Sequence, residues 1–320
     1  MRVLMTGADG QLGRCLSDRL PAWWVVRACN SQQLDITRAS MVSAMVTEFQ
    51  PTVIINCAAW TAVDKAETDP QQAMAVNATG AANLAAAASE SGARLLHIST
   101  DYVFDGNRTT PWREDDIPAP LNVYGMTKWQ GEKNIQALLP QAIIVRTSWV
   151  FSEYGQNFVK TMMRLAQSHD CLSVIADQVG CPTYAGDLAE CLIALAQHPD
   201  AHGIYHYCGD SAVSWFEFSE AIFALMKSHR PEATTPQVNA ISAAESSSAV
   251  QRPAMSVLDC QRIENLGIVR SDWQRALRQV VDPPTSDRVN SSNIIRWKCV
   301  GRHRCTHGLI RSAIFSPTFH

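Results

Sequence analysis

The first residues of the chain limit its fold more than any other stretch. The apolar segment Val3-Leu4-Met5 runs into a turn that contains Gly7, Gly10 and Gly13, and then into an amphipathic segment that ends near Leu20. Strand, glycine turn and helix in this order suit a dinucleotide pyrophosphate, because glycine permits close backbone approach and a helix start offers free N–H groups. The spacing is G-x-x-G-x-x-G rather than G-x-G-x-x-G, and a plain strand-to-helix turn is the alternative.

Apolar runs alternate with helical segments up to about residue 150. Further strands are predicted at Val25-Val26-Arg27-Ala28, Val53-Ile54-Ile55-Asn56, Arg94-Leu95-Leu96-His97-Ile98-Ser99 and Ala142-Ile143-Ile144-Val145-Arg146. This alternation predicts an α/β protein with a doubly wound, parallel Rossmann sheet. We therefore expect a dinucleotide-binding domain over residues 1–150. A smaller C-terminal substrate lobe over residues 151–281 would be interleaved with it.

The final stretch, residues 282–320, differs from the rest in composition. It is nearly devoid of acidic residues and rich in Arg, Ser and Asn, with no clear period. These features predict a disordered basic tail. Cys299, His303, Cys305 and His307 lie there, but their spacing fits none of the usual zinc patterns. The sequence therefore assigns no metal site.

Composition and charge exclude several classes of function. The chain has 320 residues, and its formal net charge of -3 gives no basis for binding nucleic acid or an anionic membrane. No apolar run reaches the roughly 20 residues needed to span a bilayer. The N-terminus enters a strand rather than a signal peptide, and the 10 cysteines are scattered without a C-x-x-C pair. We therefore expect reduced thiols and a cytoplasmic protein.

Tyr124 and Lys128 stand four residues apart at the start of a predicted helix. This spacing places both side chains on one face. A nearby ammonium lowers the pKa of a phenol, which could then exchange a proton with a substrate hydroxyl or carbonyl. Taken alone, the pair occurs on many helices, where a solvated lysine beside a half-buried tyrosine is the ordinary case.

Other polar and aromatic residues follow predicted strands, where open α/β sheets bind their ligands. Ser99, Thr100 and Asp101 end one strand, and a hydroxyl there could hydrogen-bond a substrate carbonyl or serve a local turn. Trp149 follows the next strand and could form one wall of a sugar pocket or fill the core. Arg252 could pair with a substrate phosphate, although a surface arginine is the commoner case.

Two polar residues have open interpretations. Asp35 could contact the adenine end of a cofactor, or Asp35 or Thr37 could cap the following helix, and one residue could do both. Asn77 lies in an Ala-rich helix predicted from Pro70 to Ser91, and the sequence favours an exposed residue over a polar brace. The second strand ends without an acidic residue to hold a ribose 2′-OH, so NADPH is not excluded and strict NADH selectivity is not supported.

Several separate motifs support a resemblance that runs from Met1 to about Val281. They are the glycine turn Thr6 to Gly13, the block Asn56 to Glu67, Ser99-Thr100-Asp101-Tyr102-Val103-Phe104, Leu121-Asn122-Val123-Tyr124-Gly125 with Lys128, and Arg146-Thr147-Ser148-Trp149-Val150. Together they resemble extended short-chain dehydrogenases and, more closely, the dTDP-4-dehydrorhamnose reductase family.

The resemblance implies reduction of the C4 ketone of dTDP-4-dehydro-L-rhamnose with NADPH or NADH. The product would be dTDP-L-rhamnose for cell-surface polysaccharide such as O-antigen. Two alternatives share the same fold. One is a reductase or epimerase of another nucleotide sugar, and the other is a non-catalytic, NADP-binding regulatory subunit.

By position, the resemblance makes Tyr124 the proton donor and Thr100 its assistant at the carbonyl. Lys128 would lower the pKa of Tyr124 and hold the nicotinamide ribose. Thr100, Asp101 and Trp149 would contact the sugar nucleotide. With the turn glycines, the cofactor-binding residues would be Gly7, Gly10, Gln11, Leu12, Gly13, Asp35, Ile36, Ala58, Ala59, Thr61, Tyr124 and Lys128.

The sequence departs from the family pattern at two positions. Some members dimerise through Mg2+ held by glutamates, and Cys15 stands where one such ligand is expected. Trp60 stands where a histidine is common. The resemblance therefore allows a homodimer but does not extend the Mg2+ site to this chain.

Overall fold

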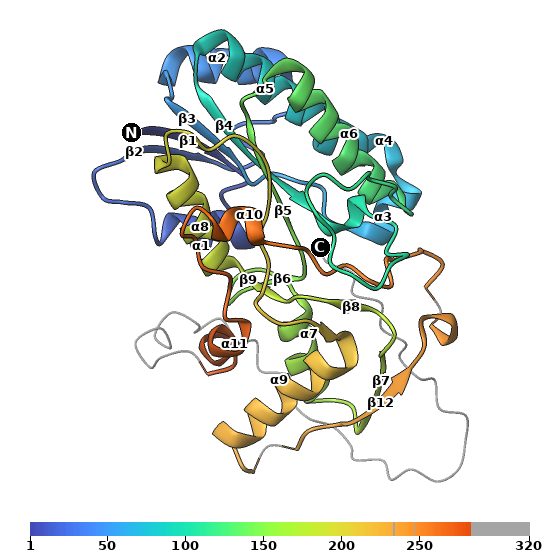
Figure 1. Ribbon diagram of the computed structural model, residues 1–320. Helices are drawn as coiled ribbons and strands as arrows, with labels where there is room; N and C mark the ends of the chain where they lie inside the picture. Colours follow the sequence, from blue (N-terminus) through green and yellow to red (C-terminus); the bar gives the residue numbers. More distant parts are fainter. Residues whose placement is uncertain (233, 247, 283–320) are drawn as a thin grey trace.

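The computed structural model describes residues 1–232, 234–246 and 248–282. Residues 283–320 of the predicted basic tail lie outside the described residues, and so do its cysteines and histidines. Figure 1 shows a large α/β body joined to a smaller lobe that carries α7, α9 and α11. Within the described residues, no helix combines the length and hydropathy that crossing a bilayer would require.

A six-stranded parallel sheet forms the centre of the large body. Its order is β10-β5-β4-β3-β1-β2, and every neighbouring pair is parallel. The strands are β1 (Arg2–Thr6), β2 (Val25–Cys29), β3 (Val53–Asn56), β4 (Arg94–Thr100), β5 (Ile143–Thr147) and β10 (Gly203–His206). The strand order reverses at β1, and such a switch point opens a crevice at the carboxyl edge of a sheet. The predicted doubly wound Rossmann fold is confirmed.

Both faces of this sheet are covered, which explains the continuous apolar runs of its strands. Leu4 and Ile54 belong to the apolar cluster under α2, α5 and α6, whereas Met5 and Ile55 belong to the cluster under α1 and α8. This alternation follows the two-residue period of a strand. Figure 1 shows the two helical layers. The helices are α1 (Gln11–Ser17), α2 (Ala39–Phe49), α5 (Gly80–Ser91), α6 (Val123–Leu138) and α8 (Ala185–Gln197).

The segment between β3 and α5 corrects the expectation for Asn77. It contains α3 (Val63–Thr68), α4 (Pro70–Met74) and a π-helical turn at Ala75–Thr79, so the predicted single long helix is interrupted. Asn77 is 1% exposed, and its amide bonds the backbone N–H and C=O of Trp60 and the hydroxyl of Thr127. A Cβ on Gly131 would lie 2.2 Å from Asn77 O, so this glycine lets α6 approach and bury the amide. Asn77 is a polar brace, not an exposed residue.

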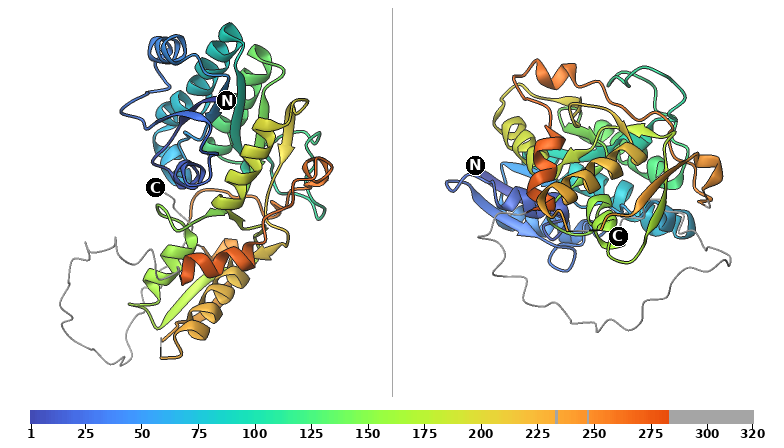
Figure 2. Two further views of the ribbon diagram at one scale, coloured as in Figure 1. Left: turned by 90° about the vertical axis from the view of Figure 1, so that its left-hand side faces the viewer. Right: turned by 90° about the horizontal axis from the view of Figure 1, so that it is seen from below.

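The smaller lobe has its own aromatic core. Phe158 and Phe218 stack with ring centroids 5.5 Å apart, and Trp273 meets Phe218 edge-on. The elements are α7 (Phe158–Leu165), β7 (Cys171–Ile175) paired with β12 (Gln237–Ile241), α9 (Trp215–His229) and α11 (Trp273–Val281). Two short strand pairs and one short helix remain. They are β6 (Val150–Phe151) with β9 (Thr183–Tyr184), β8 (Val179–Gly180) with β11 (Val213–Ser214), and α10 (Gln261–Glu264). Figure 2 shows how the chain passes between the two bodies, as α8 and β10 return to the large sheet.

Candidate active site

A cavity of about 340 Å3 lies at the carboxyl edge of the large sheet. Residues from the glycine turn, from the ends of β3, β4 and β5, from α6 and from α9 line it. The cavity thus lies where the strand order predicts a ligand. The sequence-predicted residues in its lining are Gly10, Gln11, Leu12, Ala59, Thr61, Thr100, Asp101, Tyr124, Lys128 and Trp149. The predicted residues outside its lining are Gly7, Gly13, Asp35, Ile36, Ala58 and Arg252.

The glycine turn beside the cavity accepts no larger residues at two positions. Gly7 has a φ of +68°, and a Cβ there would lie 2.6 Å from Ala58 N. A Cβ on Gly13 would lie 2.2 Å from Gly7 O. Helix α1 begins after Gly10 without a side-chain cap, so its first N–H groups remain available. This backbone cradle fits a dinucleotide pyrophosphate, and Gly10, Gln11 and Leu12 would hold it.

Asp35 and Ile36 shape the turn that follows the second strand. Asp35 Oδ1 accepts hydrogen bonds of 3.0 Å and 2.7 Å from the backbone N–H and hydroxyl of Thr37. Helix α2 begins after Arg38 without a side-chain cap, so the helix-cap interpretation of Asp35 is wrong. Ile36 is buried, and its carbonyl accepts a 2.8 Å hydrogen bond from Asn83.

Helix α6 places Tyr124 and Lys128 on the cavity wall. Its N-cap, Asn122, accepts a 2.8 Å hydrogen bond from the N–H of Gly125 and donates one to the carbonyl of Gln251. A Cβ on Gly125 would lie 2.2 Å from a backbone oxygen of the turn after β4, so the helix start lies directly against the end of that strand. Tyr124 and Lys128 therefore lie on one side of α6 and line the same cavity, as their spacing predicts.

The electrostatics of Tyr124 differ from the expectation. Burial raises the pKa of its phenol above the ordinary value, and the charge of Asp101 acts in the same direction, whereas a hydrogen bond with Thr100 opposes both. Lys128 is not among the groups that act on the pKa of Tyr124, so the predicted lowering is absent, and Lys128 Nζ donates a 2.6 Å hydrogen bond to Ile98 O on the strand. Tyr124 is therefore a protonated phenol at neutral pH, which is the form that donates a proton.

Lys128 is 2% exposed and has no carboxylate partner within ion-pair distance among the described residues. Burial lowers the pKa of its ammonium to about 8. His97 Nε2 lies 3.4 Å from Nζ, and His97 Nδ1 lies 2.8 Å from Asn56 Nδ2. Asn56 and His97 were not predicted to be site residues. The one sequence feature that could have indicated a role is that each is a polar residue in an otherwise apolar strand.

Three buried polar atoms at the cavity have no partner among the described residues. They are Ser99 Oγ, Thr147 Oγ1 and Asp101 Oδ2. Burial also raises the pKa of Asp101 to about 7. Thr100 Oγ1 donates a 3.0 Å hydrogen bond to Asp101 Oδ1. Because unsatisfied buried polar groups are costly, such a group of them indicates a place for a polar ligand.

Trp149 combines both roles that its position suggested. It lines the cavity and stacks on Trp215 of α9, with ring centroids 3.4 Å apart and planes within 5°. Its φ of +49° is unusual for a residue with a side chain. A Cβ on Gly180 would lie 2.5 Å from the indole, so only glycine leaves room for it. Trp215 is a cavity residue that sequence reasoning missed.

Arg252 and Cys15 both lie away from the cavity. The guanidinium of Arg252 donates to both carboxylate oxygens of Asp64, at 2.9 Å and 3.0 Å, and to the Ser248 hydroxyl at 2.7 Å. The structure therefore does not bring Arg252 into the cavity to meet a phosphate. Cys15 is fully buried in the cluster under α8, and burial raises the pKa of its thiol to about 12.

Comparison with known proteins identifies the family of this chain. Residues 1–285 match the family model for the RmlD substrate binding domain. A dTDP-4-dehydrorhamnose reductase of Aggregatibacter actinomycetemcomitans is 46% identical over 287 residues, which cover 87% of this chain and 98% of that protein. The chain belongs to the dTDP-4-dehydrorhamnose reductase family. The resemblance drawn from the motifs is therefore confirmed.

Two further proteins are similar to this chain over most of its length. The crystal structure of dTDP-4-dehydrorhamnose reductase from Bacillus anthracis in complex with NADP matches with a TM-score of 0.82 and 39% identity, covering 87% of this chain and 98% of that chain. A Streptomyces antibioticus protein named "Probable dTDP-4,6-dihydroxy-2-methyloxan-3-one 4-ketoreductase" is 39% identical over 287 residues, or 87% of this chain and 94% of that protein.

Proposed function

We propose that this chain reduces the C4 ketone of dTDP-4-dehydro-L-rhamnose to dTDP-L-rhamnose, with NADPH or NADH as the reductant. The observation that carries the proposal is the convergence of Tyr124, Lys128 and Thr100 on one cavity, next to a glycine cradle. Membership of the family supports the same reaction.

Tyr124 would supply the proton. Its raised pKa keeps the phenol protonated at neutral pH. The O–H bond of the phenol breaks as a new O–H bond forms on the former ketone oxygen. A reduced nicotinamide, held by the glycine turn and Lys128, would supply the hydride to C4. A correctly placed general acid contributes roughly 100-fold to 10,000-fold to such a step.

Thr100 and Asp101 would orient the sugar. The Thr100 hydroxyl interacts with the phenol of Tyr124, and it would donate to the ketone oxygen once its proton turns away from Asp101 Oδ1. Asp101 Oδ2 and Ser99 Oγ are both buried, have no hydrogen-bond partner among the residues that the structure describes, and are suited to sugar hydroxyls. The stacked indole of Trp149 would form an apolar wall beside the ring.

Lys128 and the glycine turn would hold the cofactor. An ammonium at the cavity wall can donate to ribose hydroxyls, while the start of α1 faces the pyrophosphate. We place the reaction in the cytoplasm. The eight cysteines in the described part of the chain are all free thiols, which supports a reducing compartment.

The test follows NADPH and NADH absorbance with the purified full chain across a panel of 4-keto-sugar nucleotides. We expect the fastest oxidation with dTDP-4-dehydro-L-rhamnose. Faster turnover of another 4-keto sugar would replace the substrate but keep the chemistry. Binding of NADPH without oxidation by any member of the panel would contradict the proposal and favour a regulatory subunit.

A further inference from the structure

Three polar side chains form a row across the large sheet, beneath α6. The strand register makes Thr6 of β1 the neighbour of Asn56 of β3, and Asn56 the neighbour of His97 of β4. Each of the three is 1% exposed. The row ends at Lys128, whose Nζ lies 3.4 Å from His97 Nε2. Because buried polar groups require partners, the direction of each hydrogen bond can be derived.

The backbone N–H of Ala58 fixes the polarity of the row, because a backbone N–H can only donate. It lies 3.1 Å from Asn56 Oδ1, which also accepts a 2.7 Å hydrogen bond from Thr6 Oγ1. The amide nitrogen of Asn56 therefore faces His97 Nδ1, at 2.8 Å. An amide nitrogen can only donate, so His97 Nδ1 accepts. A neutral imidazole that accepts at Nδ1 carries its proton on Nε2.

The Nε2–H of His97 restricts what Lys128 can do. Two N–H donors cannot hydrogen-bond each other, so an ammonium on Lys128 gains nothing from the imidazole. Its hydrogen bond to the strand goes to Ile98 O, at 2.6 Å, and its other N–H groups can turn to the cavity that it lines. If Nε2 of His97 carried a lone pair in place of its proton, it would accept a hydrogen bond from a second N–H of Lys128. That N–H would then point to the strand and not to the cavity.

We propose that His97, fixed by Asn56 with its proton on Nε2, is a positioning residue that directs the N–H groups of Lys128 into the cavity. The role of Lys128 rests on the proposed function. The position of the proton on His97 does not, because it follows from the hydrogen bonds of the folded chain alone.

Other titratable groups close to Lys128 also act on the pKa of its ammonium. Burial lowers the pKa of Lys128 to about 8, while Glu132 on the next turn of α6 and Cys57 after β3 act in the opposite direction. Burial, and then the charge of Lys128, lower the pKa of His97 well below its usual value. The imidazole is thus neutral whenever the ammonium is present beside it.

The direct test is a long-range 1H–15N correlation spectrum of the histidine side chains in the 15N-labelled full chain. The chain has 9 histidines, and the spectrum of His97→Gln assigns the signals of His97. We expect an unprotonated Nδ1 and a protonated Nε2, unchanged over roughly pH 5 to 8. A proton on Nδ1, or titration to the imidazolium within that range, would overturn the proposal.

A second test reverses the polarity of the row. In Asn56→Asp a carboxylate still accepts from Ala58 and Thr6, but it can no longer donate to His97. The imidazole proton should therefore move to Nδ1, and Nε2 should hold the ammonium. We expect weaker NADPH binding, measured by fluorescence, and a rise of about one pH unit in the pH at which affinity is half lost.

The double variant Asn56→Asp with His97→Leu separates the proton position from the new charge. If His97 transmits the effect, the upward shift should largely disappear relative to His97→Leu alone. An equal shift with and without the imidazole would assign the effect to the carboxylate and contradict the proposal. Both readouts are independent of turnover. A chain that shows the expected spectrum but never oxidises NADPH would contradict only the proposed function.

Discussion

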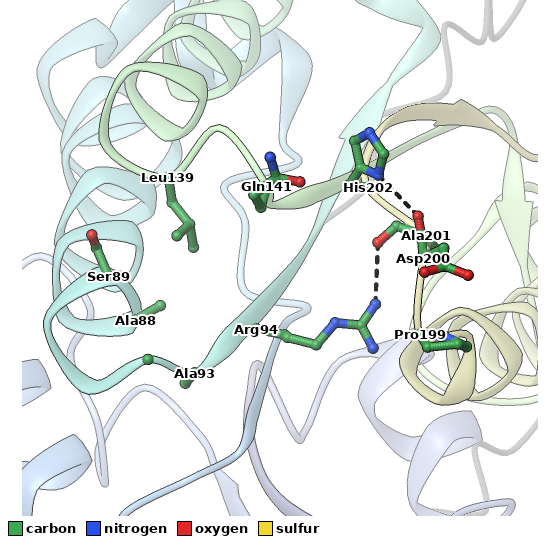
Figure 3. Close-up of a pocket in the computed structure, with 11 residues that line it drawn as sticks. Ala88, Ser89, Ala93, Arg94, Leu139, Gln141, Pro199, Asp200, Ala201 and His202 are labelled. Atoms are coloured by element: carbon green, nitrogen blue, oxygen red, sulfur yellow. Dashed lines mark hydrogen bonds between the residues drawn. The ribbon is translucent and has the colours of Figure 1, made fainter.

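Two hollows at opposite edges of the large sheet differ in how their polar groups are satisfied. The hollow at the amino edge, shown in Figure 3, has a volume of about 460 Å3. There Arg94 spans the hollow and donates to backbone carbonyls that include those of Ala196, His198 and Ala201. At the carboxyl edge, Ser99 and Asp101 instead keep buried oxygen atoms without partners in the described part of the chain.

The difference teaches that unsatisfied polar groups identify the functional cavity. Arg94 at the amino edge stabilises the fold, because its guanidinium donates hydrogen bonds to several backbone carbonyls. The carboxyl-edge groups cost stability, since burial shifts the pKa values of Lys128 and Asp101 against their charged forms. Polar residues held at such a cost are a mark of a site. Substitutions at the two edges should therefore have opposite effects on activity and stability.

The largest effect should come from Tyr124→Phe. Removing the hydroxyl removes the proton donor, so kcat should fall by roughly 100-fold to 10,000-fold. The aromatic packing remains, and NADPH affinity should stay nearly unchanged. Steady-state kinetics and fluorescence titration measure the two quantities. His202→Ala at the amino edge is the matched control and should leave both unchanged; a Tyr124→Phe enzyme with near-normal turnover would exclude the assignment.

Lys128→Met should separate activity from stability. Loss of the ammonium should lower both NADPH affinity and kcat, by about 100-fold in kcat/KM. Because burial lowers the pKa of Lys128, its charged form destabilises the fold at neutral pH, and the unfolding free energy of the variant should be equal or higher. Kinetics and urea unfolding test both halves. A variant that lost stability and activity together would place Lys128 with the structural residues instead.

Arg94→Met should show the reverse pattern at the amino edge. The variant leaves several backbone carbonyls without a charged donor, so unfolding free energy should fall by about 2–3 kcal/mol. The kcat and KM of the folded fraction should not change, because the hollow in Figure 3 shares no lining residue with the cavity that Tyr124 lines. Urea unfolding gives the first quantity. A selective loss of turnover would remove the contrast between the two edges.

The final comparison is the pH dependence of stability in Asp101→Asn. Burial raises the pKa of Asp101 from 3.8 to about 7 in the folded chain. Its contribution to stability is therefore fully present below about pH 4 and is lost as pH rises to about 7, at up to about 1.4 kcal/mol per pH unit. The variant should lack this slope. Urea unfolding at a series of pH values measures it, and identical slopes in both proteins would show that Asp101 is not shifted.

The sequence predicted what depends on short-range pattern. Apolar runs such as Val53-Ile54-Ile55 predicted the buried parallel strands, and the spacing of Tyr124 and Lys128 predicted their shared wall. Both patterns are visible within a few residues of the chain.

The sequence failed where distant contacts decide. Asn77 is buried because Gly131 lets another helix approach. Arg252 pairs with Asp64, 188 residues away in the chain, which no short-range pattern indicates, while its contact with a substrate phosphate stays a prediction. The pKa of Tyr124 rises rather than falls, because burial is a property of the folded chain and outweighs its neighbours.

The most direct measurement of the proposed reaction uses NADPH that carries deuterium at both C4 positions of the nicotinamide. The full chain would convert dTDP-4-dehydro-L-rhamnose with this reductant, and NMR would locate the label in the product. We predict one deuterium at C4 of the rhamnose ring, and a much slower transfer by Tyr124→Phe. Label at another carbon, or oxidation of NADPH without label in the sugar, would contradict the account.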